Sequence, residues 1–377
     1  MKNYLLLPLA ATLLSASLLV QSCNAQAPAK QPVSAFVISD YFKTDKVLDE
    51  QVNKIFNRLS DSERVGQMIV PAVGRLGKPD AEVEALIKEG RIGGVLLLNG
   101  SMESFQNYVQ RFDSIAQAHN RMPLVYSADA EPSLIPRKIQ GSSPVPKTAE
   151  LKDVKEARAV AKTIAADLKK IGILYNYAPV TDLSKQNQAI GNRSFGSDPG
   201  HVAEMNKAFI EATQEEGIAA TAKHFPGHGL VSGDTHKQLV YIDGELKESP
   251  VYLPLIDAGV LSVMVGHIAV ENNEQFNTNG MPATLSRNIV TTLLKEQMGF
   301  KGIVTTDAMN MGAVSKIPDA SLKAVEAGID MVLMPLNEKE TLYSILAKMD
   351  EDKAFRDQVY ESVKKIIRFK LVLGVMR

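Results

Sequence analysis

Short apolar runs alternate with helix-like segments along most of this 377-residue sequence. Each run has the length and apolar content of a buried strand, and the segments between the runs carry the spacing of amphipathic helices. The runs lie at residues 65–70, 93–98, 123–129, 173–179, 218–223, 261–267, 301–307 and 329–334. This alternation predicts an α/β fold, a single (β/α)8 barrel of the TIM type, with an open doubly wound sheet as the alternative.

Polar side chains end or follow several of these runs. Asp129 ends the third run, Asp182 lies just beyond the fourth, Lys223 ends the fifth, His267 the sixth and Asp307 the seventh. The carboxyl ends of all these strands converge only if the sheet closes on itself, which favours the barrel. We therefore expect an active site at the carboxyl ends of the strands.

Histidines are concentrated in one loop. Four of the six lie between positions 224 and 267, and the stretch 222–229 is followed at once by Asp234-Thr235-His236. Pro226 and nearby glycines forbid a regular helix there. Acid–base chemistry and metal binding are both open at this point, since His224, His228, His236 and Asp234 are all metal-ligand types. However, Pro226 and Gly227 remove the helix that an i,i+4 histidine pair would use.

Composition limits the range of partners. The chain has 42 basic and 43 acidic residues and a net charge of −1, with no long run of one sign. Charge therefore gives no indication of nucleic-acid binding, and we expect none. A hydrophobic content of 45% with 23% charged residues is typical of a globular domain.

The N-terminus carries a targeting pattern. Lys2 precedes an apolar run over residues 5–20, which is short for a membrane span and typical of a signal peptide. Cys23, the only cysteine, follows directly and resembles the lipidated residue of a bacterial lipoprotein. The alternative is cleavage after Ala25, which gives a soluble exported protein.

These features predict the organisation and location of the chain. We expect an exported lipoprotein of the bacterial cell envelope, in the periplasm or at the outer membrane, that meets the membrane only through its lipid. The predicted segments are a signal peptide at 1–22, a tether at 23–44 and one barrel domain at 45–377.

Several motifs, taken together and in order, resemble family 3 of the glycoside hydrolases. Within that family the match is to the bacterial β-N-acetylglucosaminidase (β-hexosaminidase) branch, and it covers about residues 45–375. The motifs are Lys223-His224-Phe225-Pro226-Gly227-His228-Gly229, Asp234-Thr235-His236, Ile190-Gly191-Asn192-Arg193-Ser194-Phe195-Gly196, Asp198-Pro199, Met264-Val265-Gly266-His267-Ile268 and Thr305-Thr306-Asp307-Ala308-Met309-Asn310-Met311.

The resemblance implies a catalytic set. Asp307 corresponds to the carboxylate nucleophile of a retaining glycosidase. His236 corresponds to the acid/base, a role that an imidazole can fill because it titrates near neutral pH. Asp234 lies two residues earlier, so in an extended segment both side chains point the same way and the carboxylate can support the imidazolium. The implied activity is exo-acting release of terminal β-linked GlcNAc through a glycosyl-Asp307 intermediate.

The resemblance also implies sugar-binding residues. Charged groups can fix the orientation of a sugar ring through strong hydrogen bonds. The implied contacts are Asp129, Arg137, Arg193, Lys223 and His224, with Met264 and His267 as pocket wall. One departure is the family's Asp-x-Glu-Gly-Gly run, which here is Asp129-Ala130-Glu131-Pro132-Ser133. The missing glycines put the loop up to Arg137 in question.

No cofactor and no metal are implied, and we expect a monomer that binds a carbohydrate containing β-linked GlcNAc. Two alternatives belong to other classes: a catalytically impaired glycan-binding lipoprotein, motivated by the altered 131–133 loop, and a metal-dependent barrel hydrolase. Phosphate in place of water as the acceptor is also open, because a neutral histidine carries no charge that repels it. The peptidoglycan, chitin or host origin of the glycan is not encoded in these motifs.

Overall fold

The computed structural model describes Met1 and residues 36–183 and 187–376. The chain divides into two compact units, Met1–Val33 and Ser34–Arg377. The expected signal peptide beyond Met1, Cys23 and most of the expected tether lie outside the described residues, and all helices and strands named below belong to the second unit.

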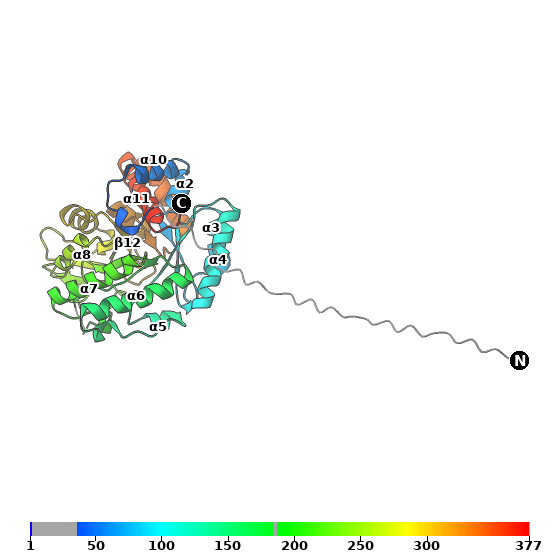
Figure 1. Ribbon diagram of the computed structural model, residues 1–377. Coiled ribbons are helices and arrows are strands. Elements are labelled where there is room, and N and C mark those ends of the chain that lie inside the picture. The colour runs from blue at the N-terminus through cyan, green and yellow to red at the C-terminus, as the bar shows by residue number, and fades with distance from the viewer. Residues whose placement is uncertain (2–35, 184–186, 377) are drawn as a thin grey trace. The chain divides into compact units, whose positions relative to one another are not determined.

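A seven-stranded sheet forms the centre of the second unit, and all its strand pairs are parallel. Figure 1 shows its strand β12 among the surrounding helices. Its strands follow one another in chain order without a reversal, so the doubly wound alternative is wrong. In spatial order the strands are β12 (Ile303–Thr306), β10 (Ser262–Val265), β8 (Ala219–Phe225), β7 (Tyr175–Asn176), β5 (Val125–Ala128), β3 (Gly94–Leu97) and β2 (Ala72–Val73).

A second parallel pair, β1 (Ile69–Val70) with β13 (Val332–Leu333), adjoins both edges of this sheet. On one side the Thr306 N–H donates to the Met331 carbonyl at 3.1 Å, and on the other the Gly93 N–H donates to the Ile69 carbonyl at 3.1 Å. The sheet is therefore curled, and the unit has a barrel-like α/β fold.

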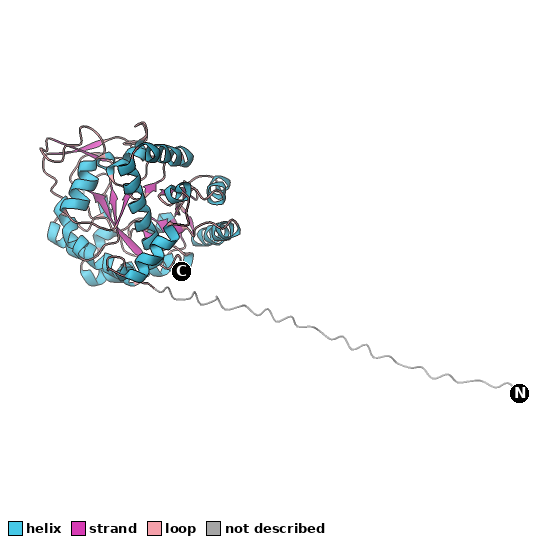
Figure 2. Cartoon of the chain, turned by 90° about the horizontal axis from the view of Figure 1, so that it is seen from above, coloured by secondary structure: helices cyan, strands magenta, loops and turns pink. Residues whose placement is uncertain are grey.

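Helices surround the strands, as Figure 2 shows from above. Their apolar faces pack on the sheet, whose strands are buried almost throughout because both faces are covered. The α-helices are α1 (Lys46–Phe56), α2 (Asp61–Gly66), α3 (Asp80–Lys88), α4 (Met102–Ala118), α5 (Ile135–Lys138), α6 (Val154–Ile171), α7 (Pro199–Glu215), α8 (Leu253–Asp257), α9 (Ala320–Ala327), α10 (Glu338–Glu351) and α11 (Lys353–Val372). A π-helix, η6 (Asn288–Gln297), precedes β12.

The first predicted strand, residues 65–70, is wrong in its first half. Ser60 and Glu63 form a capping box that begins α2, and this helix continues through Gly66. The strand starts only at Ile69 and is divided into β1 and β2 by Pro71, which has no N–H to give to a ladder.

Two short parallel pairs lie outside the main sheet. β9 (Val240–Asp243) pairs with β11 (Ile268–Glu271), and β4 (Gly100–Ser101) pairs with β6 (Ile139–Gln140). β9 follows the histidine-rich loop in the chain and β11 follows His267. This pair therefore comes after the carboxyl ends of β8 and β10, where the predicted site residues lie.

Residues 36–42 begin the described part of this unit and pack against its last helix. The Arg368 guanidinium of α11 donates to the carbonyls of Asp40 and Tyr41 and pairs with the Asp49 carboxylate of α1 at 2.5 Å. Within the described residues, no helix combines the length and apolarity that a membrane span requires.

Candidate active site

An ion-pair network joins the ends of β5 and β8. The Lys223 ammonium, only 2% exposed, lies 2.5 Å from the Asp129 carboxylate and 2.6 Å from that of Glu131. The Arg193 guanidinium binds both Glu131 oxygens at 2.7 Å each. Each buried charge thus has opposite charges beside it, as burial requires. The network brings together the predicted residues Asp129, Arg193 and Lys223.

The second cation on Asp129 is Lys138, the neighbour of the expected sugar contact Arg137. Lys138, at the end of α5, forms an ion pair with Asp129, whereas the Arg137 side chain is exposed. Burial alone raises the pKa of a carboxyl, but the Lys138 and Lys223 ammonium groups outweigh burial and hold the pKa of Asp129 well below its usual value. Asp129 is therefore a carboxylate clamped between two ammonium groups.

The altered 131–133 loop has hydrogen bonds of its own. The Ser133 hydroxyl donates to the Asn192 carbonyl at 2.8 Å and accepts from the Thr148 N–H at 3.0 Å. Asn192 precedes Arg193, so the serine that replaces a glycine ties the Asp129 loop to the loop that carries Arg193. Neither Ser133 nor Lys138 was identified from the sequence; Ser133 lies where this chain departs from the family pattern.

Asp182 orients His224. The Nδ1–H of His224 donates to the Asp182 carboxylate at 2.7 Å, and the His228 N–H donates to the same carboxylate at 2.7 Å. Burial lowers the pKa of His224 to about 3 and raises that of Asp182 to about 6. At neutral pH His224 is uncharged, and its Nε2 remains an acceptor for a sugar hydroxyl.

Glu248 organises the glycine-rich part of the histidine loop. Its buried carboxylate accepts from the N–H groups of Leu183 at 2.9 Å, Gly229 at 3.1 Å and Leu230 at 3.0 Å. Gly227 packs directly on it: a Cβ at Gly227 would lie 2.3 Å from the Glu248 Cβ. Sequence reasoning missed Glu248, because its partners are backbone groups of distant segments.

The Asp234–His236 contact is made within a turn, and the expected extended segment is wrong. The Lys237 N–H donates to the Asp234 carbonyl at 3.0 Å. The Asp234 carboxylate accepts from both the N–H and the Nδ1–H of His236, at 3.0 and 2.8 Å. The His236 ring is 65% exposed, so its Nε2 is accessible for proton transfer.

This dyad is joined to the segment that follows Asp307. The Gly312 N–H donates to the His236 carbonyl at 3.1 Å, and the Ala313 N–H donates to the Thr235 carbonyl at 3.2 Å. The Thr235 hydroxyl also lies 3.0 Å from Nε2 of His228. The histidine loop and the strand end bearing Asp307 are thereby held together.

Asp307 follows β12, and its carboxylate accepts from the Ala308 N–H at 2.8 Å. Burial favours its neutral form, but His224, His267, the Ala308 N–H and the Lys223 ammonium outweigh burial, so the pKa of Asp307 lies below its usual value. Asp307 is a carboxylate at neutral pH, the form that a nucleophile needs.

His267 and Met264 are both buried. The His267 Nε2–H donates to the Ala308 carbonyl at 3.0 Å, and Nδ1 lies 2.7 Å from the Thr284 hydroxyl. His267 therefore supports the backbone beside Asp307. Among the described residues, no group of three His, Cys, Asp or Glu side chains is placed to hold a metal ion.

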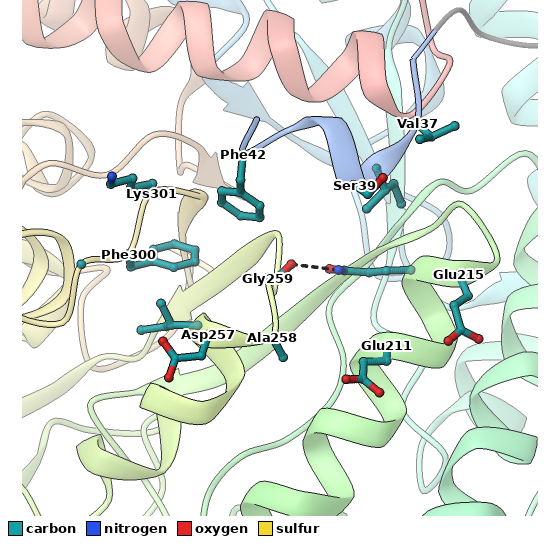
Figure 3. Close-up of a pocket in the computed structure, with 14 residues that line it drawn as sticks. Val37, Ser39, Phe42, Glu211, Glu215, Asp257, Ala258, Gly259, Phe300 and Lys301 are labelled. Carbon is teal, nitrogen blue, oxygen red and sulfur yellow. Dashed lines mark hydrogen bonds between the residues drawn. The ribbon is translucent and has the colours of Figure 1, made fainter. Parts of the chain in front are cut away.

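A separate cavity of about 780 Å³ lies at the amino ends of the strands, away from the site residues (Figure 3). Its wall includes Gly259, just before β10, and Lys301, just before β12, whereas the site residues follow the carboxyl ends of these strands. Val37 and Phe42 line it, so residues 36–42 lie at this amino-end face.

Comparison with known proteins gives one consistent result. Residues 61–369 match the model of the glycosyl hydrolase family 3 N-terminal domain. A Vibrio cholerae protein named beta-hexosaminidase is 31% identical over 276 residues, which cover 71% of this chain and 82% of that protein.

Solved structures agree. A glycoside hydrolase family 3 β-N-acetylglucosaminidase from Paenibacillus is 29% identical with a TM-score of 0.76, covering 84% of this chain but 63% of that one. A β-N-acetylhexosaminidase from Beutenbergia cavernae is 27% identical with a TM-score of 0.75, covering 83% of this chain and 98% of that one.

Proposed function

Because the chain belongs to glycosyl hydrolase family 3, we propose that it is an exo-acting retaining β-N-acetylglucosaminidase that removes terminal β-linked GlcNAc from a glycan. One observation carries this proposal. The Asp307 carboxylate and the Asp234–His236 dyad lie on segments that hydrogen-bond to each other through Gly312 and Ala313. A retaining glycosidase needs a nucleophile and a proton donor beside one glycosidic bond.

In the first step the Asp307 carboxylate attacks the anomeric carbon as the bond to the leaving oxygen breaks. Protonated His236 gives its Nε2 proton to that oxygen, while Asp234 accepts the Nδ1–H and stabilises the imidazolium. In the second step neutral His236 takes a proton from water, the water oxygen bonds to the anomeric carbon, and the bond to Asp307 breaks. GlcNAc leaves and the starting charges are restored.

The ion-pair network binds the sugar in this proposal. Asp129, Lys138, Arg193 and Lys223 offer charged hydrogen-bonding groups, and His224 offers Nε2 as an acceptor. Because their positions are fixed before substrate arrives, little ordering remains to be done on binding. Lys138 adds to this set a charged group that the sequence did not identify.

Trapping with a 5-fluoro-N-acetylglucosaminyl fluoride tests the function. The fluorine slows both steps, and the good leaving group lets the first step proceed, so the covalent intermediate accumulates. Peptide mass spectrometry should find the label on Asp307, and an Asp307→Asn variant should take up none. Label on another carboxylate, or no turnover of an aryl N-acetylglucosaminide, would contradict the proposal. Running the reaction with and without phosphate identifies the acceptor, which we expect to be water.

We also propose that the curled sheet closes as a single (β/α)8 barrel over residues 45–377, with β1 and β2 forming one strand position. The backbone hydrogen bonds on both sides of the β1–β13 pair support this. For the N-terminal region we propose a signal peptide and lipidation at Cys23, as the sequence indicates. We propose that the mature protein is a monomer in the cell envelope. Mass spectrometry of the mature protein tests the lipid.

A further inference from the structure

The turn that carries the Asp234–His236 dyad has a buried side chain at its centre. Thr235 lies between the two dyad members and is 2% exposed, whereas the His236 side chain is 65% exposed. The Thr235 hydroxyl lies 3.0 Å from Nε2 of His228. The exposed His236 ring is therefore presented by a turn whose middle side chain contacts a buried histidine.

His228 is itself fixed to the sugar-binding side of the site. Its backbone N–H donates to the Asp182 carboxylate at 2.7 Å, and the same carboxylate accepts from the Nδ1–H of His224 at 2.7 Å. The rings of the two histidines meet edge to face, with their centroids 6.1 Å apart. His228 thus shares one buried anchor with His224, the proposed sugar contact.

The His228 ring has no polar contact besides Thr235 within the described part of the chain, because its Nδ1 has no hydrogen-bond partner there. His228 is 3% exposed, and burial lowers its pKa, so the ring is uncharged at neutral pH. A buried, uncharged ring does not donate a proton to substrate. Its effect on the reaction therefore passes through Thr235.

These contacts form one continuous path from the sugar pocket to the proton donor. The path runs from His224 through Asp182 and His228 to Thr235, whose neighbour is His236. A general acid must lie within hydrogen-bond reach of the oxygen that it protonates. A displacement of about 1 Å can cost about a hundredfold in rate, so the length of this path affects catalysis.

We propose that His228 is a positioning residue for the acid/base: through the Thr235 hydroxyl it sets the distance between the His236 ring and a sugar bound at His224. The contact acts on proton donation to the leaving group and leaves the attack by Asp307 unaffected. This inference rests on the proposed function and adds to it a residue that determines how well the enzyme cleaves bonds to poor leaving groups.

Aryl N-acetylglucosaminides with different leaving groups separate proton donation from the rest of the reaction. Dinitrophenolate leaves without a proton, whereas the leaving oxygen of the unsubstituted phenyl glycoside needs one. The measured quantity is the ratio of kcat/KM for the 2,4-dinitrophenyl glycoside to that for the phenyl glycoside. Loss of the positioning contact should raise this ratio, whereas a general loosening of the site lowers both values and leaves the ratio unchanged.

Four variants test the contact. Thr235→Val removes the hydroxyl at nearly constant volume and should raise the ratio about tenfold, the size of one hydrogen bond. His228→Phe keeps a ring but removes its nitrogens, and should raise the ratio by the same factor. The double variant should also stay near tenfold, because both changes remove one shared contact. Thr235→Ser keeps the hydroxyl and should remain within about twofold of the unchanged enzyme.

Thr213→Val is the matched control. Thr213 is also buried, and its hydroxyl donates to the Phe209 carbonyl at 2.8 Å within α7. Its ratio should equal that of the unchanged enzyme. Ratios within about twofold of the unchanged enzyme for both Thr235→Val and His228→Phe would overturn the proposal.

If the unchanged enzyme hydrolyses neither glycoside, the proposed function fails, and amide hydrogen exchange still tests whether the contact holds the turn. The N–H groups of His236, Lys237 and Gln238 all donate to Asp234. They should exchange about tenfold faster in Thr235→Val than in Thr235→Ser, because the turn opens more often without its buried contact. Equal exchange in the two variants would overturn the positioning role.

Discussion

Gly227→Ala tests how the histidine loop is held. At Gly227 the backbone has φ = 134°, which side-chain-bearing residues rarely adopt. The new Cβ would lie 2.3 Å from the Glu248 Cβ and 2.7 Å from its Oε2. Either the loop or Glu248 must move, and Glu248 accepts three backbone N–H groups of this region.

The magnitude follows from two contributions. Backbone strain costs about 1–2 kcal/mol for an L-residue at positive φ. Loss of one hydrogen bond to the carboxylate costs a further ~1.5–3 kcal/mol. We therefore expect the free energy of unfolding to fall by about 2.5–5 kcal/mol, the sum of the two. We also expect kcat to fall at least about tenfold, because His228 and Thr235 shift with the loop.

Urea unfolding and steady-state kinetics measure these effects. Gly299→Ala is the matched control, since Gly299 also has a positive φ of 72° but has no atom within 4 Å of the added Cβ. That variant should lose only about 1 kcal/mol, the cost of the backbone alone. If Gly227→Ala were as stable and as active as Gly299→Ala, the role assigned to Glu248 would be refuted.

Two further predictions concern Lys138 and Glu248. Lys138→Met should raise KM for the aryl N-acetylglucosaminide about tenfold or more, by removing a charged partner of Asp129, while Arg137→Met should change it less than about twofold. Equal effects would contradict this difference between the two residues. Burial raises the pKa of Glu248 from its ordinary value of 4.5 to about 7. The folded state therefore holds more protons than the unfolded state between these pH values, and the free energy of unfolding falls as pH rises through that window. Glu248→Gln removes this titration, so urea unfolding at pH 5 and pH 8 should show a smaller decline than in the unchanged protein; an equal decline would rule the assignment out.

The sequence predicted the polar residues at the strand ends, but not the residues that hold the loops around them. Asp129, Lys223, His267 and Asp307 were placed at one edge because parallel strands bring their carboxyl ends together. Glu248 could not be found this way, since it binds backbone N–H groups of segments that meet only in the fold. No side-chain pattern marks such a position.

Local geometry explains the other differences. Lys138 was not identified from the sequence, and it reaches Asp129 from the end of α5, whereas the neighbouring Arg137 is exposed. The dyad segment was expected to be extended, but the Asp234 carboxylate binds the His236 N–H as well as its ring and closes a turn. The sequence spacing therefore predicted the Asp234–His236 pair correctly, but not the turn in which the pair lies.

The position of residues 36–42 separates the start of the described part of this unit from its catalytic residues. They lie at the amino ends of β10 and β12, on the face opposite Asp307. They line the cavity at that face and bind Arg368 of α11 through the Asp40 and Tyr41 carbonyls. A change in this segment therefore acts first on the packing of α11 and reaches the catalytic residues only through the strands.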